Sequence, residues 1–214
     1  MIVPLLIAAV VGYLLGSLPF GCLVARAKGV NIFEVGSKSP GATNVRRVLG
    51  HGAGNLVLVL DVLKGAVAAG WPLLIAPRYY LADAATMDLT LVSAVGLTAA
   101  LVGHAFSCFT KFRGGKSVAT AAGGFLVLCP IGTLVAAATW ALALFVTRYA
   151  SLASMLAGVA LTVTAWFLHM PPLILGASAA AMIFVIIRHR ANISRLLAGT
   201  ESKVGSDKGQ SDTP

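Results

Sequence analysis

The sequence of 214 residues is poor in charged side chains, and above all in acidic ones. Charged residues make up 11% of the chain, whereas a soluble domain usually carries about 25%. Hydrophobic residues make up 58%, and the mean hydropathy is +0.90. So little polar material cannot cover the surface of a water-exposed globule. The composition therefore excludes an ordinary soluble domain and indicates a membrane protein.

Cysteine is also scarce. The chain has three cysteines, Cys22, Cys108 and Cys129, and none of them form a C-x-x-C motif. An odd, widely spaced set argues against both a disulfide framework and a zinc site. We expect Cys22 and Cys129 to pack as small residues within apolar segments.

Two catalytic motifs of known lipid-modifying enzymes are missing. No histidine is followed by aspartate five positions later, which removes the H-x-x-x-x-D base of one large class of glycerolipid acyltransferases. The aspartate-rich motif of CDP-alcohol phosphotransferases is missing as well, and two-metal chemistry needs clustered carboxylates. We therefore expect neither a metal ion nor a cofactor.

The charges that are present are strongly unbalanced. The chain has 16 lysines and arginines against 7 aspartates and glutamates, a net charge of +9. Such an excess fits a nucleic-acid-binding module, a membrane protein whose basic residues orient its spans, or a site for an anionic substrate. The positions of the basic residues along the chain must decide between these classes.

Long apolar runs divide the chain into candidate membrane spans. Their lengths are near the ~20 residues that cross a bilayer as a helix. The first run lacks a basic flank and continues past the length of a signal peptide, so we expect it to remain as the first span. The runs cover residues 2–25, 53–76, 89–106, 118–147, 150–169 and 171–187.

The run 118–147 is interrupted by Cys129 and Pro130. It forms either one long tilted helix or two short helices joined at the proline. Cytoplasmic ends of spans are enriched in lysine and arginine. If residues 118–147 form two helices, the chain has seven spans and 14 of its 16 basic residues lie on one side of the membrane. If they form one helix, the chain has six spans, with eight basic residues on one side and seven on the other. We therefore predict an all-α polytopic membrane protein with seven transmembrane helices, its N-terminus outside and its C-terminus cytosolic.

This topology has consequences for the rest of the chain. The loops near 77–88 and 169–172 become external, and residues 118–129 become a helix of about 18 Å, short for a hydrocarbon core of ~30 Å. Such a helix indicates a half-buried site at the cytoplasmic face, with local bilayer thinning or a boundary error as the alternatives. We expect residues 1–204 to form a single transmembrane catalytic domain and 205–214 a disordered polar tail.

Three polar clusters fall on the predicted cytosolic side. The first, residues 36–47, combines glycines, hydroxyls, an amide and two arginines, a composition typical of phosphate binding. A flexible loop with arginines that only orient the spans is the alternative. The second, residues 103–120, contains a Gly-Gly-Lys-Ser turn that gathers N–H groups and an ammonium at the start of a helix. Thr110 stands where a Walker A loop needs glycine, so a P-loop is excluded.

The third cluster, residues 188–201, is basic and follows the last apolar run. On a helix, His189, Asn192 and Arg195 share one face, which could recognise a phosphate or a polyol. The alternative is a basic helix resting on anionic lipid. Inside the second run, Asp61 and Lys64 are three residues apart, and we expect them to neutralise each other toward the protein interior. A structural pair is the favoured interpretation, and a pair that lines the site is the alternative.

Together the three clusters predict an anionic substrate, with phosphate groups and, because the bilayer is adjacent, an acyl chain. A transporter for an anionic metabolite is the main alternative, but its polar groups should lie near the middle of the membrane. A nucleic-acid module fits least well, because the positive charge is divided among three membrane-bound segments.

The motifs resemble those of one known family. Gly-Ser-x-x-x-Gly-Ala-Thr-Asn-x-x-Arg at 36–47 resembles the first signature of the PlsY-type family, bacterial integral membrane acyltransferases that use acyl-phosphate to acylate glycerol 3-phosphate. Gly-His followed by Phe-x-x-Phe-x-Gly-Gly-Lys at 103–116 resembles the second, and Arg-His-Arg-x-Asn-Ile-x-Arg-Leu-Leu-x-Gly-Thr-Glu at 188–201 the third. The likeness extends to about residue 203.

The sequence departs from these signatures at a few positions. Lys38 and Ser39 stand where the family usually has Gly-Asn, Ser107 replaces a usual proline, and Ser117 replaces a common glycine. The roles of Lys38 and Ser39 are therefore the least secure of those that the resemblance implies.

The resemblance implies an activity and a site. The chain would transfer a fatty acyl group from acyl-phosphate to the 1-hydroxyl of glycerol 3-phosphate, at the cytosolic face of the bacterial inner membrane, giving lysophosphatidic acid and phosphate in the first acylation of phospholipid biosynthesis. Its partners would be these two substrates and membrane lipid, with no nucleic acid. The implied catalytic residues are Ser37, Arg47, Lys116 and His189. The implied substrate-binding residues are Thr43, Asn44, His104, Gly114, Gly115, Ser117 and Asn192, with Glu201 in a structural role.

Overall fold

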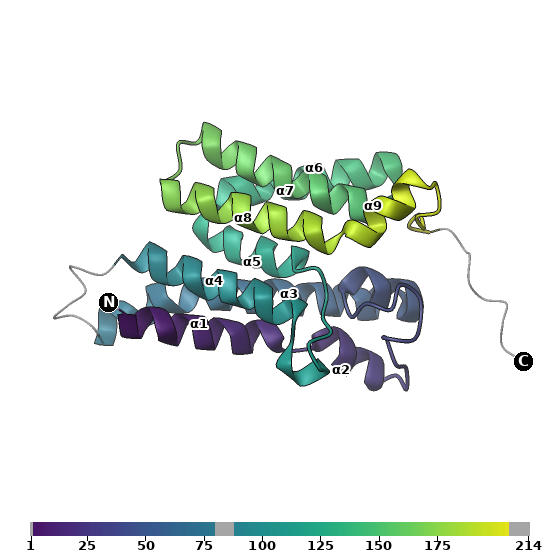
Figure 1. Cartoon of the computed structure of the whole chain (residues 1–214), viewed down its shortest axis with the longest axis horizontal. Helices are drawn as coiled ribbons and strands as arrows, with labels where there is room; N and C mark the ends of the chain where they lie inside the picture. The colour runs from purple at the N-terminus through teal and green to yellow at the C-terminus, as the bar shows by residue number, and fades with distance from the viewer. Residues whose placement is uncertain (1, 80–87, 206–214) are drawn as a thin grey trace, which may run out of the picture.

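The structure is a computed structural model that describes residues 2–79 and 88–205. Helices run along the long axis of the molecule, and α1 begins at the end opposite to α9 (Figure 1). The elements are α1 (Ile2–Ser17), α2 (Phe20–Arg26), α3 (Ala42–Tyr79), α4 (Leu89–Ala105), the 3₁₀ helix η2 (Cys108–Thr110), α5 (Val118–Leu128), α6 (Pro130–Thr147), α7 (Ala150–Phe167), α8 (Pro172–Arg188) and α9 (Arg190–Leu197).

Within residues 2–79 and 88–205, five helical segments are long and apolar enough to cross a membrane. The pair α8 and α9, bent by 58°, makes a sixth if it counts as one span. The remaining apolar helix, α5, has 11 residues and is about 16 Å long, less than the bilayer core. The protein is thus an all-helical polytopic membrane protein, as predicted, with five or six spans by length and composition.

The predicted break inside 118–147 is confirmed. α5 ends at Leu128 and α6 begins at Pro130, the first helical position, where the missing N–H of proline is not needed. Cys129 between them has φ −149° and ψ 70°, outside the helical region. The chain reverses direction at this point (Figure 1), so α5 and α6 form a helical hairpin.

The first apolar run forms one candidate span, Ile2–Arg26, as predicted, although Pro19 separates α1 from α2 within it. The start of the second span differs from the prediction. Residues 42–49 are helical, although hydropathy placed the second span only from residue 53. The backbone at Gly50, with φ 87° and ψ 175°, interrupts the helix there, a conformation that glycine adopts without a steric penalty. The arginines of the first polar cluster therefore lie on a helix.

Close packing of the helices depends on small residues. A side chain on Gly12 or Gly16 of α1 would overlap the backbone of α4 at Gly96 or Ala100. The contact of α5 with α3 is built in the same way around Gly123. Small residues at these contacts let backbones approach closely, which is how helices associate in lipid, where the hydrophobic effect between them is weak.

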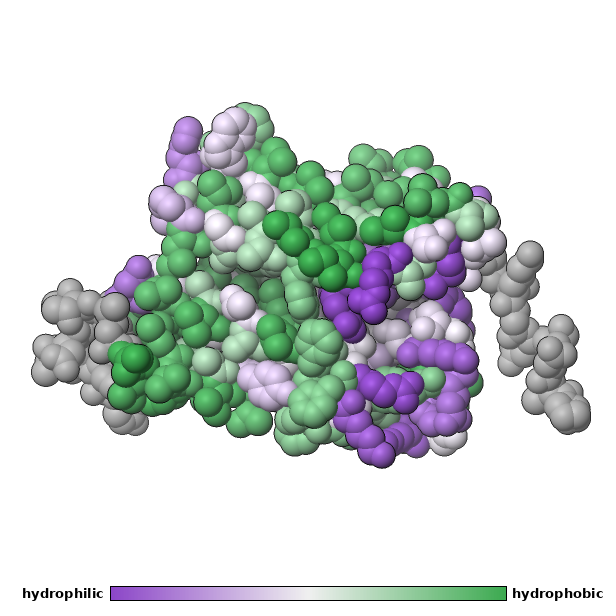
Figure 2. All heavy atoms as spheres, viewed as in Figure 1, coloured by the Kyte–Doolittle hydropathy of each residue, from purple (hydrophilic) through white to green (hydrophobic). Residues whose placement is uncertain are grey.

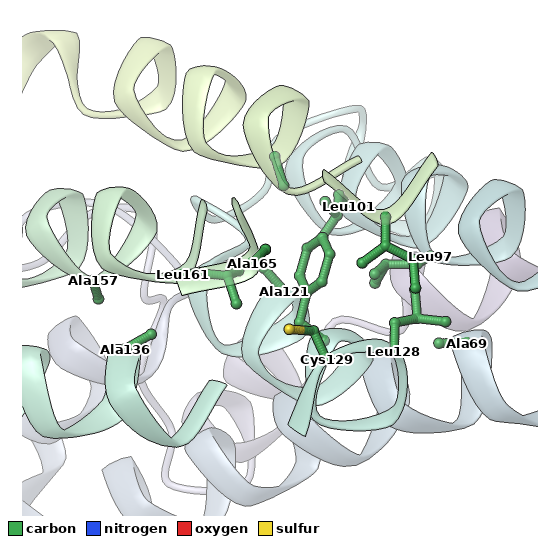
Figure 3. Packing of buried hydrophobic residues seen from close by; sticks show 13 residues of the cluster. Ala69, Leu97, Leu101, Ala121, Leu128, Cys129, Ala136, Ala157, Leu161 and Ala165 are labelled. Carbon is green, nitrogen blue, oxygen red and sulfur yellow. The ribbon is translucent and has the colours of Figure 1, made fainter. Parts of the chain in front are cut away.

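The main buried cluster lies among α4, α5, α7 and α8, with Ala69 of α3 and Ala136 of α6 at its edges (Figure 3). It includes Phe125, whose side chain is 1% exposed, together with Leu97, Leu101, Leu128, Leu161 and Ile174. A second cluster joins α2 to the segment after it and to the start of α3, through Cys22, Ala25, Ile32, Val45 and Val57. This second cluster fixes the first polar segment against the bundle.

Polar residues gather at one end of the bundle, the end that carries α9 and the two glycine-rich segments (Figure 2). Large apolar side chains such as Leu142 and Phe145 are instead exposed along the sides of the helices, where a bilayer would contact them. Most of the predicted external loop at 77–88 and of the predicted polar tail at 205–214 lies outside the described residues.

Candidate active site

A cavity of about 640 Å³ lies between α3, α5, α6, α7 and α8 and reaches the polar end of the bundle. Polar and charged side chains surround it at that end, and apolar side chains surround the remainder. Eight of the twelve predicted site residues line it: Ser37, Thr43, Asn44, Arg47, Lys116, His189, Asn192 and Glu201. The structure therefore brings together residues from all three sequence motifs.

A chain of hydrogen bonds joins the second motif to the third. Lys116 Nζ donates to Asn192 Oδ1 at 2.7 Å, and Asn192 Nδ2 donates to Glu201 Oε1 at 2.6 Å. Glu201 also accepts hydrogen bonds from Ser151 Oγ and Arg195 Nε, each at 2.7 Å. The carboxylate thus ties α7, α9 and the C-terminal segment together, which fits the structural role expected for Glu201.

The electrostatics of this chain favour an anionic ligand. Burial lowers the pKa of Lys116 to about 8; nearby Arg195 and Arg47 act in the same direction, and Glu201 opposes them. Burial alone would raise the pKa of Glu201, but hydrogen bonds from Asn192, Ser151 and Arg195 lower it. At neutral pH, Lys116 is mostly an ammonium, and only one of its three N–H donors is used by Asn192.

His189 lies at the break between α8 and α9 and is 2% exposed. Its Nδ1 is 2.8 Å from the carbonyl oxygen of Val185. Because a carbonyl only accepts, we assign the proton to Nδ1, which leaves Nε2 as an acceptor. The predicted shared face is confirmed, since His189, Asn192 and Arg195 all line the cavity. The helix itself bends at His189 instead of continuing straight.

Asn44 organises the first motif. Its Oδ1 accepts from the Ser37 backbone N–H at 2.8 Å, and its Nδ2 donates to the carbonyls of Val35 and Ser39. The amide is therefore committed to the backbone of the 35–39 segment, which it shapes around the cavity. Lys38 in this segment has φ 54°, in the left-handed region that favours glycine. Glycine, which the first signature of the PlsY-type family usually has at this position, adopts such a conformation without a steric penalty.

The other four predicted residues, His104, Gly114, Gly115 and Ser117, do not line the large cavity. Gly115 N–H donates to the His104 carbonyl at 3.1 Å, and a side chain on Gly115 would overlap the His104 ring. The Ser117 hydroxyl is fully buried and donates to the Leu101 carbonyl at 2.7 Å. These residues build the turn that carries Lys116, so the geometry favours positioning over direct substrate contact.

Arg188 completes this turn. It begins the third polar cluster and its signature, but it was not among the predicted site residues. Its guanidinium donates to the Gly115 carbonyl at 2.9 Å and to the Gly114 carbonyl at 3.4 Å, and it lies 4.9 Å from the centre of the Phe106 ring. Arg188 thus fixes the turn before Lys116 to the helix that ends beside His189. Ser151, which holds Glu201, was also missed, because a single serine at the start of an apolar helix gives no signal in the sequence.

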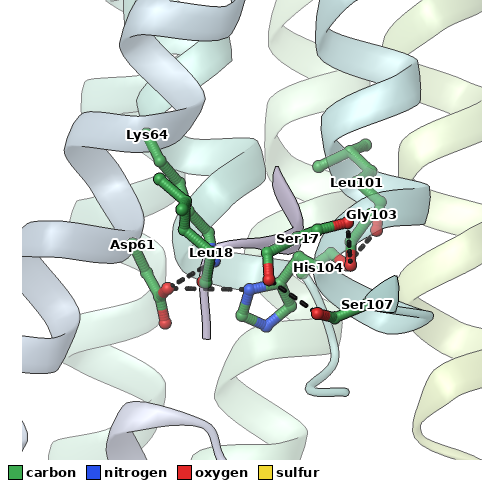
Figure 4. A network of polar contacts seen from close by, with 9 residues as sticks. Ser17, Leu18, Asp61, Lys64, Leu101, Gly103, His104 and Ser107 are labelled. Atoms are coloured by element: carbon green, nitrogen blue, oxygen red, sulfur yellow. Dashed lines mark hydrogen bonds and ion pairs between the residues drawn. The ribbon is translucent and has the colours of Figure 1, made fainter. Parts of the chain in front are cut away.

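The Asp61–Lys64 pair lies beneath the second motif (Figure 4). Asp61 Oδ1 is 2.8 Å from Lys64 Nζ and 3.6 Å from His104 Nδ1. Lys64 also donates to the carbonyl of Leu18 at 2.9 Å. Both side chains are buried, as predicted, and together they connect α3 with the end of α1 and with α4. Asp61 also lines the large cavity, so the pair both joins helices and borders the site.

Within residues 2–79 and 88–205, no group of three or more His, Cys, Asp or Glu side chains is arranged to hold a metal ion. The three cysteines are free thiols, and Cys22 and Cys129 are buried in apolar surroundings, as expected. What the cavity offers is a cationic, hydrogen-bonding end joined to an apolar interior. This combination suits an amphiphile with an anionic head.

Comparison with known proteins gives a consistent result. A profile of the family described as glycerol-3-phosphate acyltransferase matches residues 6–199. The glycerol-3-phosphate acyltransferase of Fusobacterium nucleatum is 43% identical over 195 residues, covering 91% of this chain and 95% of that protein. That of Geobacter sulfurreducens is 42% identical over 198 residues, covering 92% and 96%. That of Bacillus subtilis is 38% identical over 205 residues, covering 95% and 98%.

Two crystal structures of PlsY, an integral membrane glycerol 3-phosphate acyltransferase, have the same fold. The glycerol 3-phosphate form superposes with a TM-score of 0.84 at 37% identity, and the lysophosphatidic acid form with a TM-score of 0.82 at 36% identity. Each comparison covers 94% of this chain and 96% of the other. The chain therefore belongs to the glycerol-3-phosphate acyltransferase family, as an integral membrane protein of the PlsY type.

Proposed function

We propose that this glycerol-3-phosphate acyltransferase takes its acyl group from acyl-phosphate and transfers it to the 1-hydroxyl of glycerol 3-phosphate. The products are lysophosphatidic acid and phosphate. The observation that carries the proposal is the amphipathic cavity, whose cationic end holds Arg47 and Lys116 and whose interior is apolar. The two crystal structures of PlsY, one in the glycerol 3-phosphate form and one in the lysophosphatidic acid form, support the same pair of substrate and product.

The side chains at the cationic end supply the chemistry. Arg47 and Ser37 bind phosphate oxygens, and the unused N–H donors of Lys116 stabilise charge that develops on the acyl carbonyl oxygen and on the departing phosphate. The 1-hydroxyl oxygen bonds to the acyl carbon, and the bond from that carbon to the phosphate oxygen breaks with its electron pair on phosphate. The hydroxyl proton goes to a substrate phosphate oxygen or to His189 Nε2, and no acyl-enzyme is formed.

The choice of donor has a direct test. Purified protein in detergent is supplied with glycerol 3-phosphate and either acyl-phosphate or acyl-CoA. We expect acyl-phosphate to give phosphate and lysophosphatidic acid at equal rates, and acyl-CoA to give no product. Turnover with acyl-CoA and no phosphate release from acyl-phosphate would overturn the donor assignment.

The low pKa of Lys116 predicts a pH dependence. Because burial lowers this pKa to about 8, kcat/KM for glycerol 3-phosphate should fall as pH rises through about 8, where the ammonium loses its proton. A bound phosphate raises the pKa, so kcat should persist to higher pH, since kcat reports the substrate-bound enzyme. Rate measurements from pH 6.5 to 9.5 follow kcat/KM and kcat separately. In Lys116→Arg, kcat/KM should not fall over this range, because the guanidinium keeps its proton. A flat kcat/KM up to pH 9 would contradict this role.

We further propose that seven helices cross the bilayer, with the cavity open to the cytosol of a bacterial cell. Residues 1–204 form its one catalytic domain. The positions of the basic residues support this sidedness.

In a Cys108→Ser background, a membrane-impermeant maleimide should label Lys28→Cys only in inside-out vesicles and His169→Cys only in right-side-out vesicles. Both native positions are exposed, and the other two cysteines are buried. The seven-helix topology places an odd number of membrane crossings between positions 28 and 169, so the two cysteines must face opposite sides. Labelling of both from the same side would refute this topology.

A further inference from the structure

The apolar part of the cavity is lined mainly by very small side chains. These come from four helices: Ala122 of α5, Ala136 of α6, Ala157 and Gly158 of α7, and Ala181 of α8. Small residues at facing positions leave a space that side chains do not fill. Under the proposed function, on which this inference rests, that space receives the acyl chain.

The depth of this space can be followed along α7. Its lining residues run from Ala150 at the polar end to Leu161, which is about 16 Å along the helix axis. Leu161 is the deepest lining residue of α7, as Thr133 is of α6 and Ala181 is of α8. These three residues therefore surround the far end of the cavity.

The far end is closed by packed side chains. Leu161 is 7% exposed and belongs to the main buried cluster, with Phe125, Cys129 and Ala165 (Figure 3). A Cβ atom placed on Gly132, at the turn between α5 and α6, would lie 3.2 Å from Leu161 Cδ1, so the leucine is held tightly against this turn.

The threonine at this end uses its one hydrogen-bond donor internally. The Thr133 hydroxyl donates to the Cys129 carbonyl at 3.1 Å, within the first turn of its own helix. A methyl terminus that reaches this end therefore meets mainly apolar side chains and displaces no donor from its partner. We infer that Leu161 forms the closed end of the acyl-chain site and sets the longest acyl chain that the enzyme uses well.

Changing the size of this residue should move the preferred chain length in a defined direction. Leu161→Ala opens space toward Cys129 and Ala165 and should favour longer chains, whereas Leu161→Phe should favour shorter ones. Each methylene that newly fits contributes about fourfold in affinity. For Leu161→Ala, the preference for a chain two carbons longer than the wild-type optimum should rise roughly fifteenfold.

The test is a competition among acyl-phosphates of several chain lengths in one reaction, with lysophosphatidic acids separated by mass. Product ratios within one sample do not depend on how much of a variant is folded. Leu156→Ala is the matched control, because Leu156 is on the same helix, is 41% exposed and does not line the cavity. If Leu161→Ala does not fold, Leu161→Phe and the milder Leu161→Val still report the shift.

The outcomes separate this inference from the proposed function. Wild-type protein that consumes no acyl-phosphate of any length would refute the proposed donor itself. Wild-type activity with the same product ratios in every Leu161 variant would overturn the inference and leave the donor assignment standing. A shift as large in Leu156→Ala as in Leu161→Ala would also overturn it. The expected result is opposite shifts for the smaller and larger side chains, with Leu156→Ala unchanged.

Discussion

Replacing Lys116 by alanine is expected to lower kcat/KM for glycerol 3-phosphate by about 10²–10³, the usual cost of losing one donor that stabilises transition-state charge. Lys116 is a partly buried cation that lines the cavity, and its remaining N–H groups are available to phosphate and carbonyl oxygens. Removing it also leaves Asn192 Oδ1 without its donor. Initial rates over a range of both substrate concentrations measure the loss.

The matched control is Lys111→Ala. Lys111 belongs to the same segment but is exposed and does not line the cavity, so its removal lowers the net charge equally and should change kcat/KM less than twofold. Equal losses in the two variants would mean that the effect comes from general electrostatic attraction and not from the site.

Replacing His189 by alanine is expected to lower kcat by about 10²–10⁴, the range for a group that transfers or directs a proton. His189 is held by the Val185 carbonyl through Nδ1 and lines the cavity. The exposed His51 of α3 gives the control, and His51→Ala should retain wild-type rates. Thermal unfolding in detergent checks that each variant is folded.

His189→Gln distinguishes the two destinations proposed for the hydroxyl proton. A glutamine amide reaches close to the position of Nε2 but takes up no proton near neutral pH. Retention of more than a tenth of wild-type kcat would assign the proton to substrate phosphate and leave His189 an orienting role. A loss equal to that of His189→Ala would support proton transfer to the imidazole.

The helices were predictable where composition changes sharply. Pro130 marks the start of a helix, and the distribution of lysine and arginine separated the two interpretations of 118–147, so the α5–α6 break was correctly expected. The helix at 42–49 was not expected, because it is polar and its stability comes from packing Val45 against α2. The bend at His189 is likewise a product of tertiary contacts.

The kinds of residues that form the site could be predicted from the sequence, but the contacts that position them could not. Arginine, lysine and histidine in glycine-rich segments indicate anion binding wherever they meet, and the resemblance to the family signatures implied Arg47, Lys116 and His189 in particular. Arg188 and Ser117 hold backbone carbonyls of distant segments. Such hydrogen bonds depend on how the helices pack and have no signature in the local sequence.

The shape of the cavity also bears on the transporter alternative. A carrier for an anionic metabolite needs polar groups near the middle of the membrane. Here the charged lining residues lie at one end of the bundle, and the opposite end of the cavity is closed by the buried cluster around Leu161. This arrangement suits a reaction at the membrane surface with an acyl chain held in the interior.

The central claim is that glycerol 3-phosphate and acyl-phosphate occupy this one cavity together and react directly. Initial rates with both substrates varied test it, combined with an attempt to trap radiolabelled acyl groups on the protein by acid quenching. The account predicts intersecting double-reciprocal lines, which indicate a ternary complex, and no label on the protein. Parallel lines with a trapped acyl-enzyme would contradict it.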